Sequence, residues 1–312
     1  MDILLTGPAG QIGWELRRTL APLGTVHAVG RATRPLAADL GDPDALRAAV
    51  RAVRPQLIVN AAAYTAVDRA EQEPGLAMAV NAEAPGVLAE EAARVGAAFI
   101  HYSTDYVFDG QAAGPYGEDD PTAPLGVYGA SKLAGEQAVQ AFGGAWWILR
   151  TSWIYGARSH NFLRTMLRLG AERDALRVVD DQRGAPTWAR MVAEATALML
   201  ARAGAAGTDP AEAVGGSAGT YHLSCAGETT WCGFARAIFA QIPKAPRIEP
   251  ITTGEWPTPA RRPPYSVLAG GRLAERFGLR LPPWEAALAR CLEDMGYLPQ
   301  DSSGEDSRGR GT

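Results

Sequence analysis

The chain has 312 residues, 47% of them hydrophobic and 21% charged, and its 30 Lys and Arg are nearly balanced by 34 Asp and Glu. This balance provides no basic footprint for nucleic acid and no polybasic patch for a membrane, so neither is expected as a partner. Three cysteines without a CxxC pair argue against a disulfide framework or a zinc site and indicate free thiols. The sequence shows no basic leader and no apolar run of spanning length, so we expect a cytoplasmic protein.

In chain order, short apolar segments bounded by turn residues alternate with periodic stretches rich in Ala and Leu. The apolar segments predict strands at 3–6, 26–29, 57–60, 99–102 and 146–150. The periodic stretches predict helices at 11–20, 43–53, 75–95 and 127–142, the second opened by Asp42 and Pro43. This alternation is typical of the α/β class, and we expect a Rossmann-like, doubly wound parallel sheet.

The alternation loosens after residue 150, where Trp, Pro and Gly residues are scattered along the chain. This change predicts an NAD(P)-binding domain at 1–154, rejoined by about 178–224, and a smaller C-terminal substrate-binding lobe at about 155–177 and 225–298. Residues 203–219 are small and low in complexity, which predicts a surface loop. Residues 299–312 form a polar tail that we expect to be disordered.

Three glycines with GxxGxxG spacing follow the first predicted strand: Gly7, Gly10 and Gly13. The first glycine permits a tight turn, the second lets backbone approach a phosphate, and the third lets helix and strand pack closely. A strand, turn and helix of this kind hold a dinucleotide pyrophosphate at the helix N-terminus. Similar glycine triplets occur in turns that bind nothing, but the flanking strand and helix favour a dinucleotide site here.

The segment after the second predicted strand selects the cofactor, because an acidic residue there binds the ribose of NAD whereas arginine accommodates the extra phosphate of NADP. Arg31 and Arg34 occupy this segment and favour NADPH, with NADH as the alternative if both are solvated surface charges. Asp39 and Leu40 follow at the spacing of an adenine-edge contact. The small residues of 61–65 would let the nicotinamide half lie against backbone, although tight packing explains the same run.

Tyr128 and Lys132 stand four residues apart on a predicted helix, so both side chains lie on one face, a single turn apart. A tyrosine is an acceptable acid toward a developing alkoxide, and a neighbouring ammonium is expected to bring the pKa of Tyr128 down toward working pH. The alternative is an ordinary exposed Tyr/Lys pair, which the other motifs make the weaker interpretation.

Ser103, Thr104 and Asp105 follow a predicted strand, at the rim where doubly wound sheets bind ligands. We expect Thr104 to polarise a ketone and its two neighbours to line the pocket, unless the segment is only a turn that closes the strand. Trp153 follows the next strand and could present a flat face to a sugar or base, or be a core tryptophan. The histidines do not cluster and are interpreted as structural: His27, His101, His160 and His222.

These residues resemble the extended short-chain dehydrogenase/reductase superfamily and, within it, the dTDP-4-dehydrorhamnose reductase family. The resemblance covers the chain to about residue 298. Its motifs lie at 6–13, 60–68, 102–108, 128–136, 150–153, 184–187 and 257–263.

The resemblance implies reduction of the C4 ketone of dTDP-4-dehydro-L-rhamnose to dTDP-L-rhamnose, with hydride from NADPH and a proton from Tyr128. It implies matching roles for Thr104 and Lys132 and places Asp105 and Trp153 beside the sugar. It further implies these cofactor contacts: Gly10, Gln11, Ile12, Gly30, Asp39, Leu40, Ala63, Tyr64, Thr65 and Tyr102.

Some members of the family dimerise through a Mg²⁺ ion held by acidic residues. Glu15 fits one ligand, but Arg190 stands where another acid is expected, which argues against a metal-bridged dimer. We therefore expect no metal, and either a monomer or a homodimer.

Three alternatives remain for the function. A nucleotide-sugar epimerase or dehydratase would keep its cofactor bound, but dehydratases typically carry an acidic pair after the Thr, and Asp105 is followed here by Tyr106. Another nucleotide-sugar 4-ketoreductase fits the same motifs. A non-catalytic NADP-binding regulatory subunit is the alternative outside enzymes, and the intact Tyr128 and Lys132 count against it.

Overall fold

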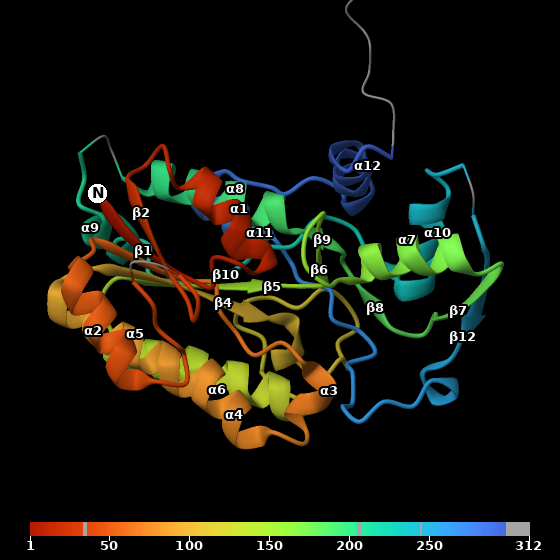
Figure 1. The fold of residues 1–312 in the computed structure, drawn as a ribbon, viewed down its shortest axis with the longest axis horizontal. Coiled ribbons are helices and arrows are strands. Elements are labelled where there is room, and N and C mark those ends of the chain that lie inside the picture. The colour runs from red at the N-terminus through yellow and green to blue at the C-terminus, as the bar shows by residue number, and fades with distance from the viewer. Residues whose placement is uncertain (34–35, 205–206, 244, 298–312) are drawn as a thin grey trace, which may run out of the picture.

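The computed structural model describes residues 1–33, 36–204, 207–243 and 245–297 (Figure 1). Within this part of the chain, six parallel strands form the main sheet in the order β10-β5-β4-β3-β1-β2. Their bounds are Asp2–Thr6 for β1, Thr25–Val29 for β2, Leu57–Asn60 for β3, Ala98–Thr104 for β4, Trp146–Thr151 for β5 and Gly219–His222 for β10. The α/β, doubly wound architecture predicted from the sequence is confirmed.

The central strands are apolar on both sides because helices cover both faces of the sheet. Every residue of β3 and β4 is buried, and Ile3 of β1 is paired in register with Leu57. Figure 1 shows α1, α8 and α11 on one face and α2, α5 and α6 on the other. These helices span Gln11–Thr19 (α1), Ala189–Ala203 (α8), Gly271–Phe277 (α11), Pro43–Val53 (α2), Ala84–Val95 (α5) and Val127–Phe142 (α6).

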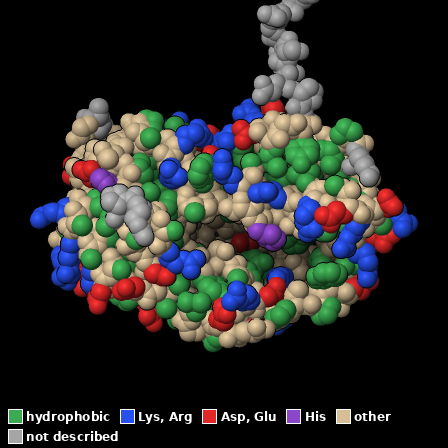
Figure 2. All heavy atoms as spheres, in the orientation of Figure 1, with side chains coloured by type: hydrophobic (Ala, Val, Ile, Leu, Met, Phe, Trp, Pro, Cys, Tyr) green, Lys and Arg blue, Asp and Glu red, His purple; other side chains and the backbone are tan. Residues whose placement is uncertain are grey.

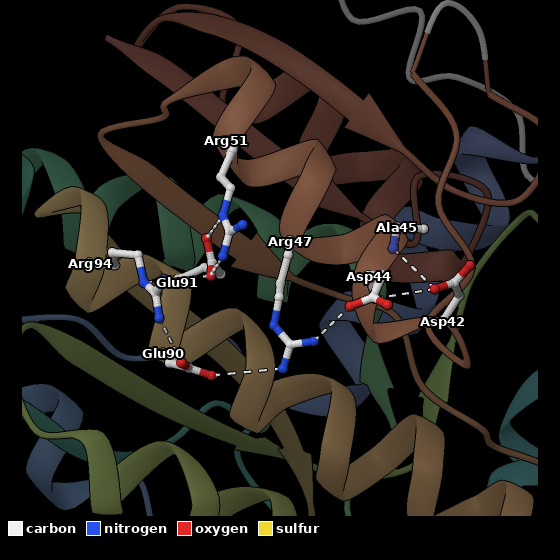
Figure 3. Close-up of polar contacts among 8 residues, drawn as sticks. All are labelled: Asp42, Asp44, Ala45, Arg47, Arg51, Glu90, Glu91 and Arg94. Carbon is white, nitrogen blue, oxygen red and sulfur yellow. Dashed lines mark hydrogen bonds and ion pairs between the residues drawn. The ribbon is translucent and has the colours of Figure 1, made fainter.

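The predicted cap of α2 is present, since the Asp42 carboxylate accepts hydrogen bonds from two backbone amides of the first turn. Figure 3 shows how α2 is joined to α5 by ion pairs. Arg51 donates to both carboxylate oxygens of Glu91, at 2.9 and 2.7 Å, and Arg47 lies 3.9 Å from Glu90. Glu91 is fully buried, and its hydrogen bonds from Arg51 lower the pKa of its carboxyl group.

The remaining strands of the described chain form small two-stranded sheets, at the right of Figure 1. Their pairs are β6 (Ile154–Tyr155) with β9 (Thr187–Trp188), β7 (Ala175–Val179) with β12 (Arg247–Ile251), and β8 (Arg183–Gly184) with β11 (Thr229–Thr230). Helices α7 (Phe162–Glu172) and α10 (Trp231–Phe239) pack against one another in this region. The domain boundaries given above stay a prediction.

Two predicted elements differ from the structure. The residues expected to form a helix at 75–95 are helical without a break, but the run consists of α4 (Pro74–Met78), a π-helical segment (Ala79–Glu83) and α5. The loop expected at 203–219 contains α9 (Pro210–Gly215), because Asp209 caps a helix there and Val214 is fully buried. The tail predicted at 299–312 lies outside the described residues.

The shorter elements complete the chain: α3 (Val67–Ala70), the 3-10 segments Asp105–Val107 and Thr253–Glu255, and α12 (Trp284–Asp294). In the described part of the chain, no helix has the length and apolar character needed to cross a membrane.

Candidate active site

An open cavity of about 2020 Å³ lies where the carboxyl ends of the central strands meet the smaller sheets. Figure 2 shows the molecule hollowed near the middle of the face in view. Pockets for one small molecule usually measure about 300–1,000 Å³, so this cavity has room for a dinucleotide and a second ligand. The site residues named in the sequence analysis line this cavity, except Gly13, which packs behind the turn, and Arg34, which lies outside the described residues.

The glycine turn forms one wall of the cavity. Gly7 has φ +68°, and a Cβ there would lie 2.7 Å from Ala62 backbone, so a larger residue is excluded. A Cβ on Gly13 would lie 2.0 Å from the Gly7 carbonyl oxygen, so this glycine allows α1 to start directly above the turn. Gly10 faces the cavity at the N-terminus of α1, whose described first turn has no acidic residue. This open, electropositive helix end fits a pyrophosphate.

The segment after β2 lines the cavity beyond the glycine turn. Gly30 forms an isolated bridge with Ala37, and its amide donates to Thr33 Oγ1 at 2.9 Å. Arg31 and Asp39 are both exposed along this wall. An exposed arginine at the end of β2 can approach a 2′-phosphate without breaking an internal contact.

The loop after β3 is fixed by Asn81, a residue that the sequence analysis missed. Asn81 is fully buried in the π-helical segment, and its side chain accepts from the Tyr64 amide at 2.8 Å and donates to the Tyr64 carbonyl at 3.0 Å. It also donates to Ser131 Oγ on α6 at 3.0 Å. The Tyr64 hydroxyl donates to Glu73 at 2.6 Å. This network joins the loop to the helix that carries Tyr128, and a π-helical turn at a functional site is common.

Tyr128, Thr104 and Lys132 are brought together at the rim of the sheet. Thr104 ends β4, and Tyr128 lies in the first turn of α6, where it is half-buried and hydrogen-bonded to Thr104. Lys132 follows one turn later and is almost fully buried. Its Nζ donates to the Tyr102 carbonyl at 2.6 Å and lies 3.3 Å from His101 Nε2.

The ionisation of this group differs from the expectation. Burial raises the pKa of Tyr128 to about 12, the bond with Thr104 opposes the rise, and the charge of Asp105 adds to it. Lys132 was expected to lower this pKa, but its amine is engaged by Tyr102 and His101 instead. Tyr128 is therefore protonated at neutral pH, as a proton donor must be.

Helix α6 reaches this position because two of its glycines contact backbone. A Cβ on Gly129 would lie 2.2 Å from the Tyr106 carbonyl oxygen, and one on Gly135 would lie 2.1 Å from the Asn81 carbonyl oxygen. Gly129 directly follows Tyr128, so its close contact with the Tyr106 backbone places Tyr128 beside the end of β4.

Asp105 is a buried carboxylate beside Thr104. It accepts from Thr104 Oγ1 at 3.1 Å and from Ser152 Oγ at 3.1 Å, and Ser266 also bonds to it. Burial nevertheless raises the pKa of Asp105 to about 6, against the lowering effect of these bonds. Raised carboxyl pKa values cluster at functional sites, and this one lies within the predicted substrate pocket.

Trp153 has backbone φ +46°, which is strained for a residue other than glycine. Its ring stacks on Trp231 with centroids 3.6 Å apart and an interplanar angle of 4°. A Cβ on Gly184 would lie 2.4 Å from the Trp153 indole. Trp231 therefore covers one face of the Trp153 ring. Only the rest of the Trp153 surface can contact a ligand, so less of the ring is available to a sugar or base than we expected.

Comparison with known proteins agrees with this geometry. The family model described as RmlD substrate binding domain matches residues 1–297. A dTDP-4-dehydrorhamnose reductase of Burkholderia thailandensis is 51% identical over 95% of this chain and 99% of the relative. The crystal structure of a dTDP-4-dehydrorhamnose reductase from Clostridium acetobutylicum is 35% identical, with a TM-score of 0.86 over 95% of this chain and 100% of that chain.

The chain belongs to the dTDP-4-dehydrorhamnose reductase family. A further solved structure, the dTDP-4-dehydrorhamnose reductase of Bacillus anthracis in complex with NADP, is 35% identical with a TM-score of 0.84, covering 94% of this chain and 99% of that chain. The dinucleotide cradle of Gly7, Gly10 and Gly13 fits this cofactor, because a Cβ at two of these positions would meet backbone.

The metal that some members of this family use does not fit the residues of this chain. Arg190 lies between two carboxylates, with Nε 3.2 Å from Glu15 and Nη1 2.8 Å from Asp294. Its guanidinium also stacks over Trp188, 4.7 Å from the ring centroid. Glu15 and Asp294 are thus both paired with Arg190, and the described residues contain no group of three or more acidic, His or Cys side chains that could hold a metal.

Proposed function

We propose that this protein reduces the C4 ketone of dTDP-4-dehydro-L-rhamnose with NADPH, giving dTDP-L-rhamnose. One observation carries the proposal: Tyr128, Thr104 and the Lys132 amine lie together on the cavity that also contains the glycine turn. A proton donor and a dinucleotide cradle on one cavity are what carbonyl reduction requires. Membership of the dTDP-4-dehydrorhamnose reductase family supports the substrate class.

NADPH, when bound, supplies the hydride that adds to C4 of the sugar. Gly7 and Gly10 would hold its pyrophosphate against the N-terminus of α1, and Arg31 would meet its 2′-phosphate. The related enzyme of Bacillus anthracis was crystallised with NADP, which supports this choice.

Tyr128 would donate the proton that converts the developing C4 alkoxide into a hydroxyl group. Because the pKa of Tyr128 is raised to about 12, the phenol is present at neutral pH, and the hydrogen bond between Tyr128 and Thr104, which lowers this pKa, would favour release of the proton. Lys132, one turn away, would bind the nicotinamide ribose and balance the charge. The ketone gains one hydride at carbon and one proton at oxygen, which completes the reduction.

Asp105, Ser103 and Trp153 would contact the sugar, from the rim of the sheet and from the first residues after β5. Helices α7 and α10 and strands β11 and β12 would then belong to the substrate-binding lobe, which we place at about 155–177 and 225–298. We also propose that the enzyme works in the cytoplasm as a monomer or homodimer. Buried free thiols support a reducing compartment: Cys225, Cys232 and Cys291.

Three alternative functions have less support from the residues of the site or need a separate test. A dehydratase needs an acid and a base after the Thr, but Asp105 is followed by Tyr106, so one carboxylate is available. A regulatory subunit has no need of a buried Lys132 beside a protonated Tyr128. A reductase of another nucleotide-linked 4-ketosugar would use the same residues, and only substrate comparison separates it.

The test is NADPH oxidation, followed by absorbance, with dTDP-4-dehydro-L-rhamnose generated in place and with NADH and the UDP sugar as comparisons. Tyr128→Phe is expected to reduce turnover by about 10² or more, as for loss of a general acid, while NADPH binding survives. Tyr106→Phe is the matched control, since its ring lies 5.7 Å from that of Tyr128. Absence of turnover with intact NADPH binding would favour another 4-ketosugar or a regulatory role.

A further inference from the structure

A row of buried polar side chains runs across the middle of the sheet and ends at Lys132. Thr6, Asn60 and His101 are lateral neighbours on β1, β3 and β4, and all three are fully buried. Thr6 Oγ1 donates to Asn60 Oδ1 at 2.6 Å, and Asn60 Nδ2 lies 3.1 Å from His101 Nδ1. His101 Nε2 lies 3.3 Å from Lys132 Nζ, which also donates to the Tyr102 carbonyl. His101 does not line the cavity, so its contact with the site passes through Lys132.

The donors around Asn60 fix the tautomer of His101. Asn60 Oδ1 accepts from Thr6 Oγ1 and from the Ala62 amide, at 2.6 and 3.3 Å, so the Asn60 nitrogen must face His101 Nδ1. An amide nitrogen can only donate, and His101 Nδ1 therefore accepts. His101 is neutral, because burial and the nearby Lys132 place its pKa well below its usual range. Its one ring proton is then on Nε2 and points at Lys132.

An ammonium group is a poor partner for this N–H, since an ammonium has donors and no acceptor. A neutral amine satisfies both neighbours, because it accepts from His101 Nε2 and donates to the Tyr102 carbonyl. Among the charged groups near Lys132, Glu136 favours the ammonium, but Arg150 holds both carboxylate oxygens of Glu136, at 2.9 and 2.7 Å. Burial lowers the pKa of the Lys132 amine to about 8. The remaining titratable neighbour on this helix face is Tyr128, which is neutral.

We propose that His101 is a positioning residue that acts through Lys132, holding its amine against the Tyr102 carbonyl and disfavouring the ammonium form. Lys132 then gains its proton when a bound cofactor supplies new acceptors, and loses it again in the empty site. The histidine thus sets the protonation of the lysine without touching either ligand. The proposal rests on the proposed function, because it concerns the same site.

The sequence permits a direct test, since it contains two lysines, Lys132 and Lys244. Full-length protein carrying lysine labelled with ¹³C at Cε gives two signals, and Lys244→Arg identifies the signal of Lys132. We expect Lys132 to titrate near pH 8 without ligand. A wild-type value at the ordinary lysine pKa, about 10.4, would overturn the proposal without any variant at the site.

Two variants test the cause. His101→Gln places an amide oxygen within reach of Lys132, and Asn60→Asp makes His101 Nδ1 the donor, so each should raise the pKa of Lys132 by about one unit or more, a tenfold change in its protonation equilibrium. His222→Gln is the matched control, because His222 is equally buried and lies on β10. The proposal is refuted if Lys132 titrates alike in all three variants and the wild type.

A kinetic measurement separates positioning from simple damage to the fold. The kcat/KM value is expected to decrease at high pH as Lys132 loses its proton. The pKa of this decrease should rise by about one unit or more in His101→Gln, as in the titration, and should be unchanged in His222→Gln. If kcat/KM of His101→Gln is instead lower by the same factor at every pH, His101 has only a structural role and the proposal is overturned. Because the NMR titration uses no substrate, a failure of the proposed function is distinguishable from a failure of this inference.

Discussion

Replacing Asp105 with Asn is expected to stabilise the protein at neutral pH while slowing catalysis. Asp105 is 2% exposed, and burial raises the pKa of its carboxyl group from 3.8 to about 6. The native protein therefore binds this proton more tightly than the unfolded chain does, so stability falls as the pH rises from about 4 to 6. A rise of about two pKa units corresponds to about 3 kcal/mol, which is the full penalty above pH 6.

The variant carries no ionisable group at this position and should escape the penalty. Relative to wild type, its free energy of unfolding is expected to be higher by about 3 kcal/mol at pH 8 and by about half that at pH 5. Its turnover should fall, because Thr104 loses the carboxylate that orients its hydroxyl group. Urea unfolding at both pH values measures the stability, and NADPH oxidation measures the turnover.

Asp68 provides a control of opposite sign. Its hydrogen bonds from Arg262 lower the pKa of its carboxyl group, so Asp68→Asn should destabilise the protein above about pH 4, where the unfolded carboxyl group ionises. An Asp105→Asn variant that is less stable than wild type at pH 8, or whose advantage does not change with pH, would refute the reasoning.

Three further outcomes follow from packing and charge. Gly184→Ala must displace Trp153, so the KM for the sugar nucleotide should rise by about tenfold or more while the Kd for NADPH, the control, is unchanged. Glu136→Gln should cost about 3–5 kcal/mol, because its arginine partner is also buried. Glu91→Gln, whose partner is half exposed, should cost about 1–2 kcal/mol, and equal costs in denaturant unfolding would contradict this account. Because Arg190 occupies the position between Glu15 and Asp294, turnover and the oligomeric state measured by sedimentation should be the same in Mg²⁺ and in EDTA. A loss of turnover or a change of oligomeric state in EDTA would show that a metal is needed.

Much of the fold could be predicted because short sequence signals, such as apolar segments and helix-capping residues, indicate where strands and helices lie. The predicted strand at 57–60 has the bounds observed for β3, and the capping residue Asp42 fixes the start of α2. The π-helical segment within 75–95 was not predicted because the Ala-rich periodicity does not reveal that Asn81 must turn inward to bind the loop after β3. The signal was present as a polar residue within an apolar helical face, but its partner is 17 residues away.

The candidate site residues could be expected on one cavity because their motifs follow strand ends, which a parallel topology brings to one edge of the sheet. Their ionisation could not be predicted in this way. Lys132 was assigned to Tyr128 from helical spacing, whereas the contact that holds it is a carbonyl on β4, 30 residues away. The stacking of Trp153 on Trp231 was equally hidden, since it joins segments 78 residues apart that only the folded chain brings together. His101 was interpreted as structural because sequence shows no cluster around it.

The contacts of Gly129 and Gly135 with backbone have an evolutionary consequence. The backbone that α6 contacts at these glycines belongs to Tyr106 and Asn81, which lie outside the smaller sheets. Substitutions in the smaller sheets could therefore diversify the sugars that are accepted, while the spacing of Tyr128 from the end of β4 stays the same. Relatives with this arrangement can change substrate while keeping the same reacting residues, whereas a methyl group added at either glycine would clash with backbone and displace α6.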